Sequence, residues 1–158
     1  MYNSTMTKEY FEDIKLNEKY RSREYHLSEK EMIEFAKVWE PRPYHIDPEF
    51  AKTTKFGSLI AIGNHLMAIG VRLTYELSCE KEIPTAYIVG LGWDEVRFTT
   101  PARPGDRLVL EREPISKRES RSNTGAGIVC YANRLLNQQG EIVLTYKVTA
   151  LVEKRPEL

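Results

Sequence analysis

The central part of the chain carries apolar residues at helical spacing. Five of them fall three or four positions apart and therefore share one helix face: Ile62, Leu66, Ile69, Leu73 and Leu77. The spacing predicts a long helix over 59–77 that is buried on at least one face and follows a loop at 56–58. Gly63 falls in the first turns of this helix, where free backbone amides and the positive end of the helix dipole attract an anion.

After this helix the pattern changes to alternation, which is typical of strands. It is clearest at 141–152, where every second residue shares one apolar face. Gly92 interrupts a strand-like run over 87–98 and indicates a β-bulge. Further strands and the turns that join them are predicted by the same signals: strands at 107–113 and 128–136, and turns at 101–106, 120–127 and 137–140.

Two short helices are predicted ahead of the long one. Ser28 and Glu31 have the spacing of a capping box, and the helix that they open stops at Pro41. Asp47 followed by Pro48 predicts a further short helix with Asp47 as its N-cap. We favour this capping role for Asp47 over a chemical one.

Together these elements predict an α+β fold. Residues 20–27 alternate loosely, as a short edge strand does, and short turns between the later strands favour antiparallel pairing. A single long apolar helix needs a sheet to bury it. We therefore expect one domain over 20–154, an antiparallel sheet wrapped around one long central helix, with residues 1–19 as an N-terminal arm.

Composition narrows the range of partners. The 158 residues suffice for a core without metal or disulfide support, and 23 basic residues balance 23 acidic ones. This balance gives no reason to expect nucleic acid or a membrane as partner. Residues 1–16 contain no apolar run that would predict a signal peptide or anchor, so a cytoplasmic protein is expected. Two cysteines and three histidines without metal-type spacing predict reduced thiols and no metal site.

The candidate chemistry lies in the stretch 39–48, between the two predicted short helices. Pro41 and Pro43 exclude regular structure there, so Glu40 and His45 are expected on a rigid loop. An acid and a histidine aimed at one point are the usual groups for moving protons. The alternative interpretation of the same pair is an exposed charge and a satisfied polar side chain.

This stretch and several later segments resemble a known family. The matching residues are Phe35-Ala36, Glu40-x-x-Pro43-x-His45-x-Asp47-Pro48, Ala51, Phe56-Gly57, Ile60-Ala61, Gly63, Gly92-Trp93-Asp94-Glu95-Val96-Arg97-Phe98, Pro101-x-Arg103-Pro104-Gly105-Asp106 and Glu141-Ile142-Val143-Leu144. Over about 20–153 the chain is similar to the MaoC-like dehydratases and (R)-specific enoyl-CoA hydratases.

The resemblance implies a fold, a partner and a reaction. The fold is the hot-dog fold, and its single chains commonly form homodimers that bind the thioester at the subunit interface. The reaction is the reversible hydration of a 2-enoyl-CoA to a 3-hydroxyacyl-CoA, on an acyl-CoA or acyl-carrier thioester, with no cofactor. By position, His45 matches the catalytic histidine, and Gly63 matches the residue whose amide holds the thioester oxygen.

The chain departs from the family pattern at three positions. Glu40 stands in the place of the catalytic Asp, which keeps the charge and adds a methylene. Arg42 replaces an Asn or Gln, and it can either pair with Glu40 or bind a phosphate or carboxylate. Val71 replaces a Ser that some hydratases carry on the central helix.

The resemblance therefore implies Glu40 and His45 as catalytic residues and Gly63 as a substrate-binding residue. Arg42, and Asn64 and His65 beside Gly63, are further candidates for binding the substrate. For Asn64 and His65, packing of a polar side chain on the helix is the alternative. Two other functions remain open: a hot-dog dimer that binds an acyl thioester without turning it over and, with less support, an acyl-CoA thioesterase.

Overall fold

The computed structural model describes residues 8–80 and 83–156. Its elements are, in chain order, β1 (Tyr20–Arg21), β2 (Tyr25–His26), α1 (Glu29–Trp39), α2 (Pro43–Ile46), α3 (Pro48–Lys52), α4 (Gly63–Glu80), β3 (Tyr87–Phe98), β4 (Arg107–Glu119), β5 (Ala126–Leu136) and β6 (Ile142–Glu153).

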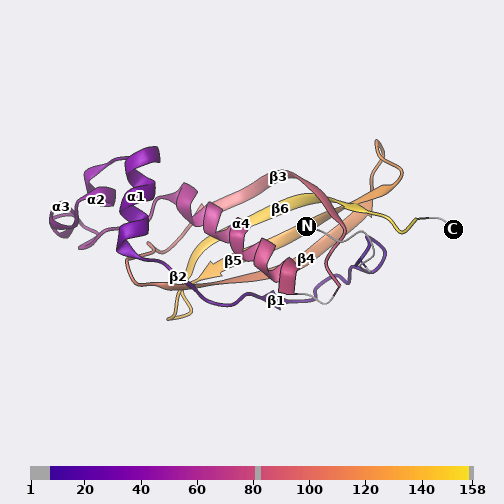
Figure 1. Ribbon diagram of the computed structural model, residues 1–158, viewed down its shortest axis with the longest axis horizontal. Coiled ribbons are helices and arrows are strands. Elements are labelled where there is room, and N and C mark those ends of the chain that lie inside the picture. Colours follow the sequence, from indigo (N-terminus) through magenta and orange to yellow (C-terminus); the bar gives the residue numbers. More distant parts are fainter. Residues whose placement is uncertain (1–7, 81–82, 157–158) are drawn as a thin grey trace.

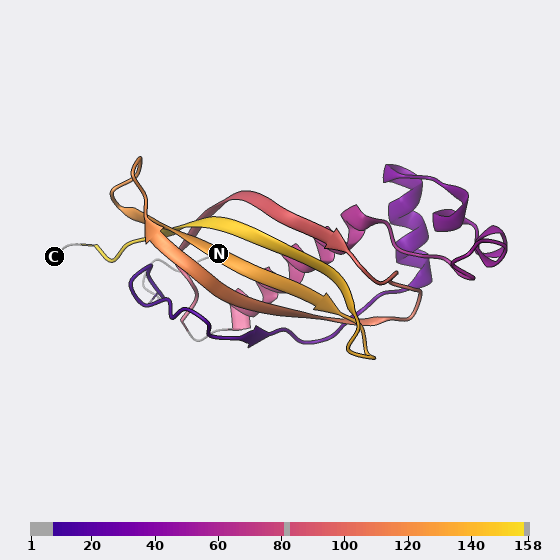
Figure 2. The same ribbon diagram turned by 180° about the vertical axis from the view of Figure 1, so that it is seen from behind.

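The long helix α4 lies across one face of an antiparallel sheet (Figure 1). The strand order is β1-β4-β5-β6-β3, and β2 also pairs with β4. Figure 2 shows the sheet from behind: no helix of the described residues covers this face. The helices α1, α2 and α3 lie together at one end of the molecule. The predicted α+β fold is confirmed, and the sheet around one helix is the hot-dog fold that the resemblance implied.

The core lies between α4 and the inner face of the sheet. Along β6 the predicted alternation is present, with these inward residues at most 8% exposed: Leu144, Tyr146, Val148, Ala150 and Val152. Gly70 allows α4 to approach this strand, because a Cβ at this position would stand 2.7 Å from the Tyr146 hydroxyl oxygen. A larger residue would push the helix away from the sheet and open the core.

Both predicted short helices are present with their caps. Ser28 Oγ accepts a hydrogen bond from Glu31 N at 3.2 Å and caps α1, which ends at Trp39. Asp47 Oδ1 accepts a hydrogen bond from Glu49 N at 2.9 Å and caps α3. The capping role of Asp47 is therefore confirmed.

Two local predictions are wrong. The stretch between α1 and α3 is not irregular throughout, because Pro43 opens the one-turn helix α2, where its fixed φ and missing N–H are tolerated. The central helix begins at Gly63 and not at residue 59. Leu59 and Ile62 are still 2% and 3% exposed, so they extend the apolar pattern without being helical.

The predicted edge strand over 20–27 is present only as two short pieces, β1 and β2, both paired with β4. Between them, the Ser22 hydroxyl accepts a hydrogen bond from Leu110 N at 2.9 Å. A side chain thus takes a position that strand backbone would otherwise fill, which splits the edge strand.

The described part of the N-terminal arm packs on the sheet. Phe11 and Ile14 are 8% and 4% exposed. Lys117 Nζ of β4 donates to the carbonyl oxygens of Phe11, Glu12 and Ile14 at 2.8 to 3.1 Å. Residues 1–7 of the predicted arm lie outside the described residues.

The predicted strands of the second half are all present. β3 pairs with β6 with a register shift between Gly90 and Gly92, so the predicted bulge is confirmed. Cys79 and Cys130 are free thiols. No helix in the described ranges combines the length and apolar character needed to cross a membrane.

Candidate active site

His45 lies on α2 and is buried, with 6% of its surface exposed. Its Nδ1 is 2.7 Å from the carbonyl oxygen of Ile60. A carbonyl oxygen can only accept, so Nδ1 carries the proton and Nε2 of the neutral ring keeps a lone pair. The Tyr44 ring packs on the imidazole with 4.3 Å between centroids. The ring is thus held in the tautomer that suits a general base.

Gly63 is the first residue of α4, three positions after the carbonyl that holds His45. In the described ranges, the N–H groups of Gly63 and Asn64 have no acceptor, as expected for a first helical turn. A Cβ on Gly63 would stand 2.5 Å from the Phe98 ring, which therefore lies against the glycine. Free amides at the positive end of an 18-residue helix suit an oxygen that gains negative charge.

Glu40 is the C-cap of α1 and forms an ion pair with Arg42. Its Oε1 is 2.6 Å from Arg42 Nε, and the two side chains are 40% and 62% exposed. Tyr44, and after it Glu40, raise the pKa of the Arg42 guanidinium by charge and hydrogen bonding. Within the described residues no hydrogen bond or ion pair joins Glu40 to His45. The ion pair with Glu40 is one of the two roles that the sequence allowed for Arg42.

Asn64 and His65 are neighbours in the chain but differ in solvent exposure. Asn64 is exposed at the start of α4. His65 is 3% exposed, stacks on Phe35 at 4.3 Å between centroids, and has Nε2 2.9 Å from Glu31 Oε1. His65 thus occupies the packed position that the sequence named as its alternative, whereas Asn64 is open to a ligand.

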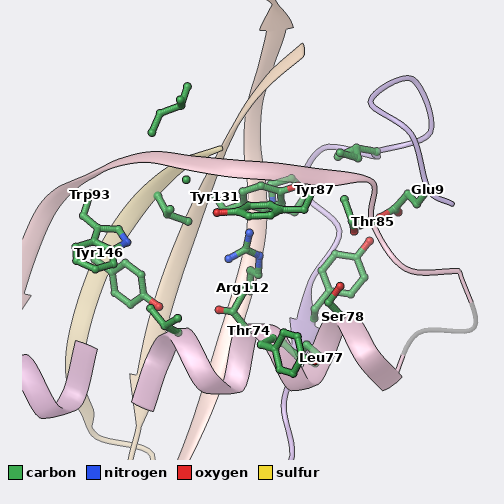
Figure 3. Close-up of a pocket in the computed structure, with 18 of the residues that line it drawn as sticks. Glu9, Thr74, Leu77, Ser78, Thr85, Tyr87, Trp93, Arg112, Tyr131 and Tyr146 are labelled. Atoms are coloured by element: carbon green, nitrogen blue, oxygen red, sulfur yellow. Dashed lines mark hydrogen bonds between the residues drawn. The ribbon is translucent and has the colours of Figure 1, made fainter. Parts of the chain in front are cut away.

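A cavity of about 540 Å³ lies beside the C-terminal half of α4, between the helix and the sheet (Figure 3). The one cation among its described lining residues is Arg112 of β4, and sequence reasoning did not single it out. A signal was available, because the alternation that puts Leu108 and Leu110 in the core continues to Arg112.

The fold is that of a hot-dog protein, and the comparisons with known proteins identify its family. Residues 13–133 match the family model described as MaoC like domain, and the chain belongs to this family. A mesaconyl-CoA hydratase of Cereibacter sphaeroides is 43% identical over 68 residues, which are 43% of this chain. The matched segment spans 20% of that relative's length.

Solved structures match over nearly the whole chain. A MaoC-like dehydratase from Rhodospirillum rubrum is 32% identical with a TM-score of 0.82, covering 94% of this chain and 99% of that one. A monoamine oxidase regulatory protein from Archaeoglobus fulgidus is 31% identical with a TM-score of 0.85, covering 95% and 97%.

Proposed function

We propose that this chain is a hydro-lyase that adds water to a 2-enoyl-CoA, giving a 3-hydroxyacyl-CoA, and that catalyses the reverse dehydration. The observation that carries this proposal is the hydrogen bond of His45 Nδ1 to the Ile60 carbonyl, three residues before the free amide of Gly63. Membership of the MaoC-like family, with a dehydratase and a hydratase among the relatives, supports the same class of reaction.

The residues divide the reaction between them. The Gly63 N–H and the helix dipole stabilise the thioester oxygen as it gains charge in the enolate. His45 Nε2 takes one proton from water while the water oxygen forms its bond to the β-carbon. The α-carbon receives this proton from the imidazolium, while the Glu40 carboxylate accepts a hydrogen bond from the water and orients it. One water is added in total, and neither side chain is changed.

The test uses the absorbance of the conjugated enoyl thioester, which disappears on hydration. The wild-type chain is expected to remove this absorbance, and His45→Ala is expected to lower kcat at least 100-fold because the base is lost. His26→Ala, an exposed histidine on β2, is the matched control and should keep full activity. Failure of the wild-type chain on 2-enoyl-CoA thioesters of every chain length tried would contradict the proposal.

A second candidate function is binding of an acyl thioester without turnover. The specific observation that favours it is the Glu40–Arg42 ion pair at 2.6 Å, which occupies the acid. Calorimetry would then detect acyl-CoA binding while the enoyl absorbance stays unchanged. Recovery of turnover in Glu40→Asp would show that the shorter acid had been the missing element.

We also propose that two copies pair through β3, as the family resemblance implies. This edge strand is exposed along its length, and Val89, Leu91 and Trp93 are 47%, 53% and 55% exposed. A long apolar edge strand is an aggregation hazard unless another strand covers it. Sedimentation equilibrium should give twice the chain mass of 18.3 kDa, and Val89→Asp should return the single-chain mass.

A further inference from the structure

Arg112 is a partly buried cation for which the described residues supply no carboxylate partner. It lies on the inner face of β4 behind Leu108 and Leu110, both 0% exposed. Within the described ranges none of the ion pairs includes Arg112, although most arginines of the chain have one. An unpaired charge away from water is costly, so its presence in a core position needs an explanation.

The neighbours of Arg112 satisfy only part of its guanidinium. Its Nη1 donates to Asn133 Oδ1 at 3.2 Å, and its Cζ lies over the Tyr131 ring, 3.7 Å from the centroid. A guanidinium has five N–H donors, so several remain for a ligand. Burial lowers the pKa of Arg112, while Tyr131 counteracts this. The accessible part of the side chain faces the cavity, where Figure 3 shows it between Tyr131 and Thr74.

The cavity around this cation has an apolar end and an acidic end. Trp93 lies at one end with Tyr146, whereas Glu9 lies at the other beside Thr85, whose hydroxyl donates to Glu9 Oε2 at 2.6 Å (Figure 3). A negative ligand group would be repelled near Glu9 and attracted to Arg112. The volume of about 540 Å³ is that of a small-molecule site.

We propose that this cavity binds a carboxylate carried on an apolar body, with the carboxylate on Arg112 and the body toward Trp93. A fork of N–H donors matches the two oxygens of a carboxylate. The contact of Arg112 with the Tyr131 ring and its hydrogen bond to Asn133 restrain the side chain, so less freedom is lost when the ligand binds. The surrounding protein lowers the effective dielectric constant relative to bulk water, which strengthens the charge interaction.

Two sources can supply this chemistry. One is a free carboxylic acid. The other is the far end of the acyl group of the thioester substrate, and this assignment rests on the proposed function. Gly63 and Thr74 lie on the same helix, 11 residues apart, which is about 16 Å along the axis. An acyl group that begins at Gly63 would therefore need a long chain to bring its own carboxylate to Arg112.

The first experiment measures binding without any reaction. Calorimetry compares octanoate with octanamide, which has the same body without the charge. Octanoate is expected to bind the wild-type chain at least tenfold more tightly than octanamide. Arg112→Met keeps an unbranched apolar stem and removes the guanidinium with its charge, and it should weaken octanoate binding at least tenfold. Arg107→Met, an exposed arginine on the same strand, is the matched control and should bind octanoate as wild type does.

Three results would overturn the proposal: no binding of octanoate at millimolar concentration, equal affinity for acid and amide, or an Arg112→Met variant that binds octanoate as tightly as wild type. If Arg112→Met does not fold, the comparison of acid and amide on the wild-type chain still decides. Arg112→Lys provides a further readout, because it keeps the charge without the fork and should bind octanoate with intermediate affinity.

The second experiment identifies the source. It compares the kcat/KM of two 2-enoyl-CoA thioesters of equal length, one ending in a methyl group and one in a carboxylate. A preference for the carboxylate substrate that Arg112→Met reduces at least tenfold assigns the site to the acyl group. Octanoate binding without such a preference assigns it to a free acid. If neither thioester is hydrated, the hydratase proposal fails, and the binding result stands on its own.

Discussion

An arginine lies toward each end of α4, Arg42 at the start of α2 and Arg112 on β4, and the two differ in their surroundings. Arg42, near the helix start, is 62% exposed and has a carboxylate 2.6 Å away on Glu40. Arg112, beside the C-terminal half, faces a cavity and lacks a carboxylate partner in the described ranges. The more exposed arginine, Arg42, thus has a carboxylate partner. The described residues supply none for Arg112, which is partly buried.

This difference indicates where an anionic group is recognised. An exposed ion pair contributes little free energy, because solvent and salt screen it. The same charge in a partly enclosed cavity interacts more strongly, because the effective dielectric constant is lower. We therefore expect Arg42 to hold Glu40 in place and Arg112 to bind the ligand's carboxylate.

The largest effect on stability is expected from a change within α4, the helix that runs from the His45 site to the cavity. Leu73 of α4 is 0% exposed, and Leu73→Ala should lower the free energy of unfolding by about 2–5 kcal/mol. Denaturant unfolding followed at both ends should show one shared transition. Arg72→Ala, an exposed neighbour paired with Glu76, should cost less than about 1 kcal/mol. Two separate transitions in Leu73→Ala would mean that the ends are independent, contrary to this prediction.

The next largest effect is expected from giving Arg112 a carboxylate partner, as Arg42 has in Glu40. Thr74 lines the cavity beside Arg112 (Figure 3). Thr74→Glu supplies a carboxylate from the chain itself, so octanoate binding should weaken more than tenfold by calorimetry. Thr74→Gln has the same length without the charge and should weaken binding much less. Equal loss in both variants would show that steric exclusion, not charge, is the cause.

The caps and the ion pair that precede α4 could be predicted from the sequence because each joins residues close together in the chain. The capping pairs at Ser28 and Asp47 each lie within three residues of their partners, and Glu40 is two residues from Arg42. Short spacing lets geometry follow from backbone angles alone. The exception is the start of α4, where Leu59 and Ile62 kept the helical spacing of apolar residues while packing into the core without a helix.

The cavity could not be predicted in the same way, because its parts come from distant segments. Arg112 meets Asn133 across the β4–β5 pairing and Thr74 across the gap between helix and sheet. His65 likewise meets Glu31 from 34 positions away. Contacts of this range depend on the register of the sheet and the position of the helix, which no single segment encodes.

Releasing Glu40 should change turnover moderately. Arg42→Ala removes the ion pair at 2.6 Å, and the freed carboxylate should raise kcat/KM on a 2-enoyl-CoA about tenfold if it orients the water. Adding Glu40→Gln to the Arg42→Ala variant should abolish that gain in kcat/KM. Lys37→Ala, an exposed cation on α1, should leave kcat/KM unchanged. A rise in KM in Arg42→Ala at constant kcat would instead mean that Arg42 binds the substrate.

The smallest effect is expected from a partly buried polar group that already has a partner. The Tyr25 hydroxyl donates to Glu31, and burial, followed by this hydrogen bond, raises the pKa of Tyr25 from 10.0 to about 12. Tyr25→Phe should lower the free energy of unfolding by about 1 kcal/mol, because the partly exposed site weakens the bond.

The pH dependence of this loss tests its cause. The neutral hydroxyl is favoured in the folded state, so the stabilisation is complete below pH 10 and disappears as the pH rises toward 12. Denaturant unfolding at pH 8 and at the highest pH that keeps the fold should show the difference between wild type and Tyr25→Phe shrinking. In a Glu31→Gln background, Tyr25→Phe should cost less, since the charged acceptor is gone. An unchanged cost would show that the stabilisation by the hydroxyl does not depend on the charge of Glu31.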